Sequence, residues 1–364
     1  MRVIVFYEVH HIYFNRYVAE LTKRLTESHR VIYLVDSFVK SNEINVPKGV
    51  VLMDVNEIRL ARFEEYDDRI FKCFAPRIPD VYWTGYFADR GFRTYQMQHG
   101  MYVEYFRRNI FGYFRSFRRR LRYLYYLAKI LRLTDEHIIG HLLHMIRKDL
   151  GLKRPKGIRM NRKWLSDVIF VWGTYWIRWF KEVKFYDDRT KYIVCGNLDN
   201  LVLRDDKRIE KVDPNDWCYV CQTLVEDERM RRSVMVGFLG RLQNWIEGRG
   251  HMLHIKLHPR SDITLYKNIL SLKNVRATNL IPICGSYIGH YSTLLSLFFD
   301  KDVHLVEFEG HPIPEFLIDG CTSLSKCDEM NFDNHRSRHL DLDDVFADVG
   351  NPFEIMAAEL KNIC

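Results

Sequence analysis

The feature that most constrains the fold is an alternation of short β-rich runs with segments of helical periodicity along most of the chain. This pattern is typical of α/β domains built on a parallel sheet. The runs predict strands at residues 3–6, 31–34, 50–53, 81–83, 94–97, 168–172, 192–194, 217–221, 254–257, 281–284 and 303–306. Helices are predicted over residues 14–27, 228–245 and 293–299. The fold class is therefore predicted to be α/β.

The chain is long enough for two such units, because it has 364 residues and a domain typically has roughly 150. We place the boundary at the start of the polar stretch of residues 186–191. Residues 1–185 are then an N-terminal lobe and residues 186–364 a C-terminal lobe. A hydrophobic content of 47% with 28% charged residues excludes a coiled coil or a disordered chain.

The cysteines and the N-terminus indicate the compartment. Eight cysteines occur without a repeating interval, which favours a reducing compartment. The close pair Cys218 and Cys221 lies in an apolar run, so a buried strand is favoured over a zinc or redox site. The N-terminus lacks the apolar region of a secretory signal, and no run of eighteen apolar residues occurs. We expect a cytoplasmic protein whose membrane contact, if any, is peripheral.

A basic aromatic insertion occupies residues 105–132. It holds nine Lys or Arg residues, nine aromatic residues and no acidic residue, whereas the net charge of the whole chain is +8. A helix that mixes arginine with aromatic residues suits the interface of an anionic bilayer. We therefore expect peripheral association with the inner face of the cell membrane. The arginines expected at this membrane or acceptor surface are Arg115, Arg118, Arg119 and Arg120.

Two other interpretations of the insertion stay open. It can be a helix whose aromatic residues face the core and whose arginines are solvated, or a groove for a polyanionic acceptor or a nucleic acid. Nucleic acid is disfavoured because no recognisable nucleic-acid-binding module accompanies the basic segment.

The most specific local motif is a predicted strand that ends in Lys256, His258, Pro259 and Arg260. In an open α/β sheet the carboxyl ends of the strands line the ligand site. Proline ends the strand, so the basic side chains are presented at this edge. The expected partner is an anion, specifically a phosphate. The alternative is that these are basic residues at a strand end without a ligand, which are also common.

A second element runs from the strand at 281–284 through a Gly-rich turn, with Gly285, to Ser292 and Thr293 before an apolar helix. Backbone N–H groups and hydroxyls at such a helix start can bind an anion. The alternative is that Ser292 only caps the helix. Neither a Walker A sequence nor GxGxxG is present, which disfavours P-loop NTPases and nicotinamide enzymes.

These two elements, together with Gln222-Thr-Leu-Val-Glu226, resemble bacterial sialyltransferases of the lipooligosaccharide and capsule polysialyltransferase type. Kdo transferases and teichoic acid glycerophosphotransferases, which also use cytidine-activated donors, share similar elements. The resemblance covers about residues 190–310 and lies in the motifs. It implies the GT-B architecture of two Rossmann-like lobes with the active site in the cleft between them, and catalysis without a metal or other cofactor.

The resemblance also implies residue roles. His258 would contact the donor phosphate and stabilise the departing nucleotide, and Ser292 and Thr293 would bind the same phosphate. Gln222 and Glu226 would lie near the nucleotide. The expected partners are a nucleotide-sugar donor, CMP-linked sialic acid first, and a cell-surface glycan or lipid-linked acceptor.

The acceptor hydroxyl needs a general base, and a segment that begins Gln98-His99-Gly100 directly follows the predicted strand at 94–97, so His99 lies at a strand end. The ordinary imidazole pKa of about 6.5 suits that role. Sialyltransferase relatives usually have an acidic-acidic-Gly motif here, whereas the His-Gly of this chain resembles the teichoic acid enzymes. A histidine held in the core or in a loop is the alternative, and Glu104 is a weaker candidate base.

The predicted function is a metal-independent glycosyltransferase. A polyol-phosphate or Kdo transferase with a cytidine-nucleotide donor is the alternative among enzymes. The alternative outside enzymes is a non-catalytic glycan- or anion-binding member of a polysaccharide assembly complex.

Overall fold

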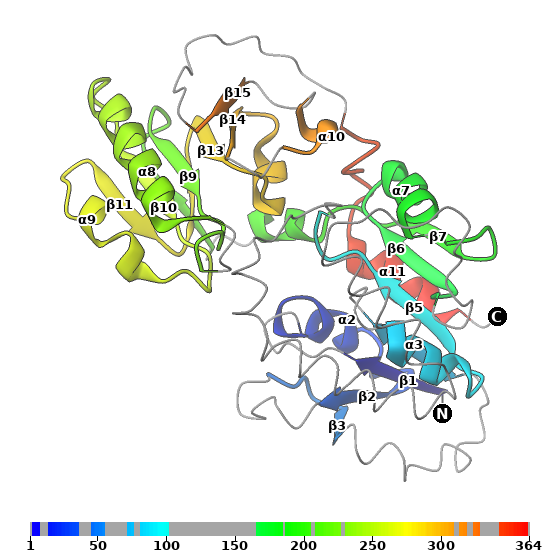
Figure 1. The fold of residues 1–364 in the computed structure, drawn as a ribbon. Helices are drawn as coiled ribbons and strands as arrows, with labels where there is room; N and C mark the ends of the chain where they lie inside the picture. The colour runs from blue at the N-terminus through cyan, green and yellow to red at the C-terminus, as the bar shows by residue number, and fades with distance from the viewer. Residues whose placement is uncertain are drawn as a thin grey trace.

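The computed structural model describes residues 2–7, 14–35, 45–54, 71–75, 81–101, 165–184, 186–204, 208–226, 230–308, 313–318, 323–327 and 342–362. These residues form two α/β lobes that lie side by side, each with its own parallel sheet (Figure 1). The predicted α/β class is therefore confirmed.

The first lobe is built on a seven-stranded parallel sheet in the order β3-β2-β1-β4-β5-β6-β7. Its strands are β1 (Arg2–Tyr7), β2 (His29–Val35), β3 (Val50–Asp54), β4 (Phe71–Ala75), β5 (Arg93–Met97), β6 (Val168–Val171) and β7 (Lys191–Val194). Its helices are η1 (Phe14–Val18), α2 (Ala19–Lys23), α3 (Val81–Ala88) and α7 (Thr174–Lys184). The strand order reverses between β1 and β4, as in a Rossmann fold.

The strand predicted at residues 81–83 is wrong, because this segment begins helix α3. Val81, Tyr82 and Trp83 have high β propensity, but propensity is a weak prior that tertiary packing overrides. In the folded lobe α3 contacts β4 and β5 instead of pairing as a strand. Strand β4 was not predicted.

The second lobe is built on a six-stranded parallel sheet in the order β11-β10-β9-β13-β14-β15. Its strands are β9 (Trp217–Val220), β10 (Leu253–Lys256), β11 (Val275–Thr278), β13 (Ser286–Gly289), β14 (Asp302–Glu307) and β15 (Ser323–Lys326). Helices of this part of the chain are α8 (Arg232–Glu247), η9 (Ile263–Leu265), α9 (Lys267–Leu270), η10 (Thr293–Phe298) and α10 (Glu315–Ile318). The order again reverses once, between β9 and β13.

The strand predicted at 281–284 exists but belongs to another sheet. It is β12 (Ile281–Ile283), which pairs with β8 (Ile209–Lys211) in a separate two-stranded sheet. The strand that enters the main sheet is β13, which the sequence pattern predicted as part of a turn. Gly285 precedes this strand and Gly289 is the last of its four residues, so glycines at both ends made the segment resemble a turn.

The cores explain why these strands form. Strands β1 and β6 are almost wholly buried, as expected for central strands of a sheet covered on both faces. In the second lobe, Tyr219 packs with Phe238 and Ile255 on one face of the sheet. Cys218 and Cys221 are both buried, as the strand interpretation predicted, and they contribute to different clusters on opposite faces of β9.

The first lobe contains two segments from beyond the predicted boundary at residue 186. By sheet membership, the first lobe extends beyond residue 185, because β7 ends at Val194. The C-terminal helix α11 (Pro352–Lys361) also returns to the first lobe, where Phe353 and Met356 join its core. The buried carboxylate of Glu359 accepts a hydrogen bond from Lys191 Nζ at 2.8 Å.

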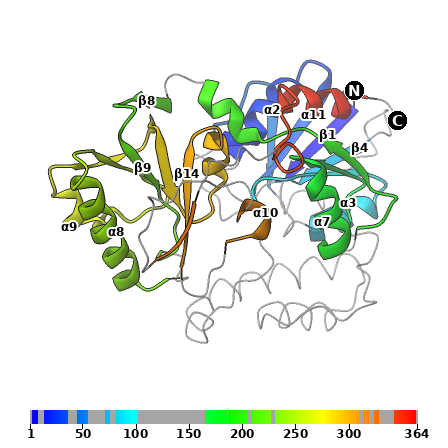
Figure 2. The same cartoon turned by 90° about the horizontal axis from the view of Figure 1, so that it is seen from above.

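Apolar contacts join the two lobes. Met101, Phe316 of α10 and Phe346 each pack against a core cluster of the second lobe and a core cluster of the first. Figure 2 shows α10 between the two sheets. The basic aromatic insertion of residues 105–132, with its four arginines, and Glu104 lie outside the described residues. Within the described part of the chain, no helix is long and apolar enough to cross a membrane.

Candidate functional site

Three loops meet at the carboxyl edge of the second sheet, where the strand order reverses. They follow β9 (residues 221–226), β10 (residues 257–262) and β13 (residues 290–292). In open parallel sheets ligands bind beside such a reversal point, because the flanking loops diverge there. The topology therefore makes this edge a candidate site without reference to any motif, as it does the equivalent reversal between β1 and β4 of the first sheet.

The loops after β9 and β13 are joined by one side-chain amide. Gln222 Nε2 donates a hydrogen bond to the carbonyl oxygen of Tyr291, and the Tyr291 N–H donates to Gln222 Oε1 at 3.4 Å. A Cβ on Gly289 would lie 2.7 Å from Leu295 Cδ1 and 3.4 Å from the Val220 carbonyl, so the close approach favours glycine. Gln222, expected near the nucleotide, thus braces the reversal point.

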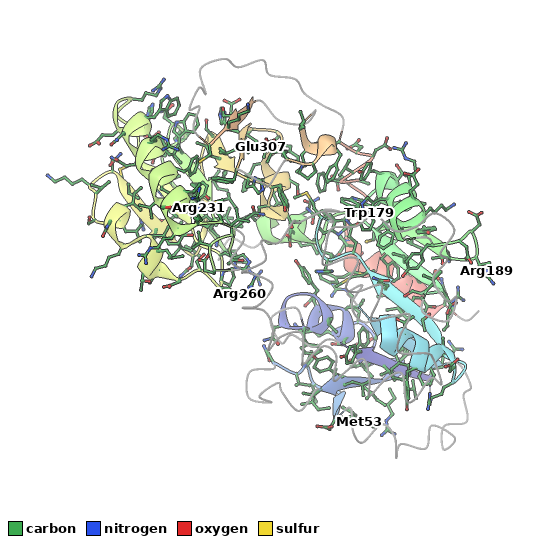
Figure 3. All side chains as sticks on the ribbon, in the orientation of Figure 1. Met53, Trp179, Arg189, Arg231, Arg260 and Glu307 are labelled. Carbon is green, nitrogen blue, oxygen red and sulfur yellow. The ribbon has the colours of Figure 1, made fainter. Side chains whose placement is uncertain are left out.

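The loop after β10 is tied to the loop after β9 at two positions. Arg260 Nη2 donates to the hydroxyl of buried Thr223 at 2.9 Å, and the Asp262 N–H donates to Glu226 Oε1 at 3.0 Å. Figure 3 shows Arg260 at the border of the second lobe that faces the first lobe. The predicted residues Gln222, Glu226 and Arg260 therefore belong to one hydrogen-bonded group of loops.

His258 is half-buried and its ring is oriented by the backbone. The Arg260 N–H donates to His258 Nδ1 at 3.1 Å, and the His258 N–H donates to Ser261 Oγ at 3.1 Å. Because Nδ1 accepts, the proton of the neutral imidazole lies on Nε2. Lys256 Nζ donates to the carbonyl oxygen of Leu257 at 2.9 Å, which keeps the ammonium at the end of the strand. Pro259, next to His258, is exposed.

Ser292 caps the short helix η10, as the alternative interpretation predicted. Its Oγ accepts a hydrogen bond from the Leu294 N–H at 3.2 Å. A hydroxyl that accepts one bond can still donate its own hydrogen, so the cap does not exclude an anion contact. Thr293 is the first residue of η10 and, like Ser292, is half-buried.

The ionisable groups beneath the loop after β9 are neutral. Burial raises the pKa of the Cys221 thiol to about 12, and burial also raises the pKa of Tyr266. Neither group supplies a thiolate or a phenolate near neutral pH. The electrostatics of this edge therefore come from the basic side chains and from Glu226.

Gly285 does not belong to this edge. It precedes β13, and the four residues of that strand separate the two edges by about 13 Å. A Cβ on Gly285 would lie 2.4 Å from the carbonyl oxygen of Pro214, so glycine is required there for close packing. The expected position of Gly285 beside the other donor-binding candidates is corrected: it lies at the opposite edge of the sheet, and Gly289 is the glycine at the carboxyl edge.

In the first lobe, His99 is the second residue after the end of β5 and is half-buried, with a buried Nδ1. Two residues further on, Met101 packs against the second-lobe cluster that contains Tyr291 and Leu295. The turn that holds His99 is therefore adjacent to the core that supports the loop after β13.

A chain of hydrogen bonds also links the first lobe to η10. Tyr17 donates to buried Asp199 at 2.8 Å, and the Asp199 N–H donates to Asn197 Oδ1 at 3.0 Å. Asn197 Nδ2 donates to Ser296 Oγ at 2.8 Å, and Ser296 donates to the Thr293 carbonyl at 2.7 Å. The start of η10 is thereby held by both lobes.

Sequence reasoning missed three residues of this arrangement: Thr223, Asn197 and Gly289. Gly289 could have been found from the sequence, because a glycine in a strand often marks a place where another segment or a ligand packs close to the backbone. The roles of the polar residues depend on contacts between segments distant in sequence, and no local pattern shows them.

No protein-family model matches the chain, and no curated protein sequence matches it. Among solved structures, UDP-GlcNAc 2-epimerase from Methanocaldococcus jannaschii aligns over 100% of both chains with a TM-score of 0.53 and 10% identity. Spinosyn forosaminyltransferase SpnP aligns over 99% of this chain and 93% of its own, with a TM-score of 0.44 and 15% identity. The wall teichoic acid polymerase TagF has a TM-score of 0.44 and 11% identity, over 99% of this chain and 79% of its own.

Identities this low show the fold alone. The full-length alignment with the epimerase agrees with two sheets that each have one Rossmann-type reversal. The predicted GT-B-like fold class of two Rossmann-like lobes is confirmed.

The placement of the two glycines can be tested with alanine. Gly285→Ala forces a Cβ against the Pro214 carbonyl, so we expect a loss of about 1–3 kcal/mol of unfolding free energy in urea. The affinity of the folded variant for nucleotide should stay within twofold. Gly289→Ala should weaken nucleotide binding, because its Cβ meets Leu295 beside the loop after β13. A stable Gly285→Ala variant with weakened binding would contradict this placement.

Proposed function

We propose that the protein is a metal-independent glycosyltransferase that moves a sugar from a cytidine-nucleotide donor to a cell-surface glycan or lipid-linked acceptor. Sialic acid is the sugar we favour. The observation that carries the proposal is the joining of three strand-end loops at the reversal point of the second sheet, with His258 among them. Such an edge is where open α/β sheets bind nucleotides.

The chemistry follows from the donors at this edge. In the transfer, the bond between the anomeric carbon and the phosphate oxygen breaks, and negative charge grows on the departing nucleotide. His258, with its proton on Nε2, would donate a hydrogen bond to that oxygen without first taking a proton from solvent. Lys256, Ser292 and the Thr293 backbone would bind the same phosphate. Preplaced donors lower the barrier because they stabilise charge that develops in the transition state.

His99 would act as the general base from the first lobe. The acceptor oxygen forms the new bond to the anomeric carbon, and its proton passes to the imidazole. Because Nδ1 of His99 is buried, the reaction would use Nε2. The packing of Met101 against the second-lobe core supports a position of the base near the loop after β13.

The cytidine donor rests on the motif resemblance at Lys256, His258 and Ser292. A polyol-phosphate or Kdo transferase would use the same phosphate contacts with a different transferred group. The epimerase with the same fold has UDP-GlcNAc in its name, so a uridine nucleotide is the comparison that any donor test must include. A non-catalytic glycan- or anion-binding role would retain binding without nucleotide release.

The donor test is thermal stabilisation by CMP, CDP, UDP and GDP, measured with the wild type and two variants. Selective binding adds stability by mass action, and we expect CMP or CDP to raise the Tm most. His258→Ala should largely remove this shift and should lower turnover of CMP-sialic acid by about two to three powers of ten. His251→Ala, which changes a histidine at the amino end of β10, is the matched control and should behave as wild type.

The outcomes of this screen distinguish the donor nucleotides from one another and the enzyme from the non-catalytic binding protein. Stabilisation by UDP alone would replace the cytidine donor, and stabilisation by CMP without release of CMP from any sugar donor would favour the non-catalytic role. A folded His258→Ala variant with unchanged kinetics would remove His258 from the mechanism.

His99→Ala tests whether acceptor activation in the first lobe is separate from donor binding in the second lobe. If His99 accepts the proton of the acceptor, transfer should fall roughly 10²- to 10⁴-fold while CMP affinity stays within a few-fold, because the second lobe holds the phosphate. Steady-state kinetics and CMP titration measure the two effects. Normal transfer would return the role to Glu104 or another carboxylate, and parallel loss of nucleotide binding would place His99 in the donor site.

We also propose that residues 105–132 attach the protein to the inner face of the cell membrane, because nine cations and nine aromatic side chains without an acid suit an anionic interface. The protein should cosediment with phosphatidylglycerol vesicles, less so at high salt, and not with phosphatidylcholine vesicles. A variant with Arg115, Arg118, Arg119 and Arg120 all changed to Glu should stay in the supernatant. Equal sedimentation of wild type and variant would favour the core-helix interpretation.

A further inference from the structure

The residue before His99 has a side-chain amide that solvent barely reaches. Gln98 is 1% exposed and follows directly on β5. A buried amide must find partners for both of its ends, since an unsatisfied buried polar group costs about 1–3 kcal/mol. The hydrogen-bond partners of the Gln98 amide therefore show which segments of the chain it holds together.

Both ends of the Gln98 amide bond to backbone around His99. Oε1 accepts the Trp172 N–H at 3.0 Å, which ties the turn to the end of β6. Nε2 donates to the Gly100 carbonyl at 3.1 Å, so the side chain spans the backbone on the far side of His99. The Gln98 N–H donates to the Phe170 carbonyl at 2.9 Å and continues the sheet up to His99. The backbone is thus held to the sheet at the residue before His99 and at the residue after it.

We propose that Gln98 positions His99. By fixing the backbone on both sides of His99, the Gln98 side chain sets the direction in which the imidazole Nε2 points. This inference rests on the proposed function, in which His99 takes the proton of the acceptor. Proton transfer needs heavy atoms within about 3 Å, and a displacement of about 1 Å can cost on the order of 10² in rate. Without the two Gln98 hydrogen bonds, His99 would still be present, but its Nε2 would point away from the acceptor hydroxyl.

The chain offers a matched control for a merely structural role. Gln96 lies two residues earlier on β5 and is 2% exposed. Its Oε1 accepts from the Tyr186 hydroxyl at 2.8 Å and from Ser166 Oγ at 3.4 Å. Gln96 shares residue type and burial with Gln98 and lies two residues earlier, on the same side of an extended chain. Its partners, however, do not flank His99.

The test compares Gln98→Met, Gln98→Glu and Gln96→Met with wild type and His99→Ala. Gln98→Met removes both amide contacts, and Gln98→Glu keeps an acceptor for the Trp172 N–H while it loses the donor to Gly100. Two readouts are needed: steady-state release of CMP from CMP-sialic acid, and the imidazole ¹⁵N signals of His99, assigned by their absence in His99→Ala. CMP titration gives the folded, donor-competent fraction of each preparation.

We expect both Gln98 variants to lose about 10- to 100-fold in kcat, with the KM for CMP-sialic acid and the CMP affinity within about twofold. Their His99 signals should shift or broaden. Gln96→Met should lose stability to a similar degree but keep kcat per folded molecule and the His99 signals of wild type.

Gln98 variants that match Gln96→Met in kcat and in the His99 signals would overturn the inference and leave the proposed function intact. If wild type and His99→Ala release CMP at equal rates, the proposed base fails instead. The His99 signals still decide the positioning role in that case, because they do not depend on turnover.

Discussion

The double hydrogen bond between the Gln222 amide and the backbone of Tyr291 joins the two strands at which the second sheet reverses its order. At that point the loops after β9 and β13 lead to opposite faces of the sheet, and a ligand can enter between them. A brace across the reversal fixes the spacing of the two loops. The positions of Ser292 and Thr293, directly after Tyr291, depend on this spacing, and the loop with His258 is held to the same group through Arg260 and Thr223.

Much of the fold could be predicted because central parallel strands are apolar throughout and their helices are amphipathic. Such patterns are local, as residues 3–6 and 217–221 illustrate. The errors occur where local preference and packing disagree. Val81 to Trp83 has strand propensity but forms the start of α3, and β13 is too short and too close to glycine to be distinguished from a turn. The return of α11 to the first lobe depends on contacts with strands more than 150 residues away in sequence, such as that of Glu359 with Lys191.

In the candidate site, too, features that depend on local sequence could be predicted and features that depend on distant contacts could not. Lys256, His258 and Arg260 could be predicted because strand ends converge at one edge of a parallel sheet. Gly285 was assigned to that edge because β13 was not recognised, whereas in the structure it lies one strand length away, at the other edge of the sheet. The amides of Gln98 and Gln222 act through backbone atoms of distant segments, so their partners are visible only in the folded chain. In both lobes a glutamine at the end of a strand holds the turn that presents the proposed chemistry.

We propose that a nucleotide phosphate binds at the reversal point of the second sheet. A crystal structure of the protein with CMP tests it most directly. The phosphate should lie within hydrogen-bond distance of His258 Nε2 and of Ser292, with Gln222 still bonded to the Tyr291 backbone. A phosphate bound at the amino edge of that sheet, beside Gly285, or in the first lobe away from His258 would contradict the claim.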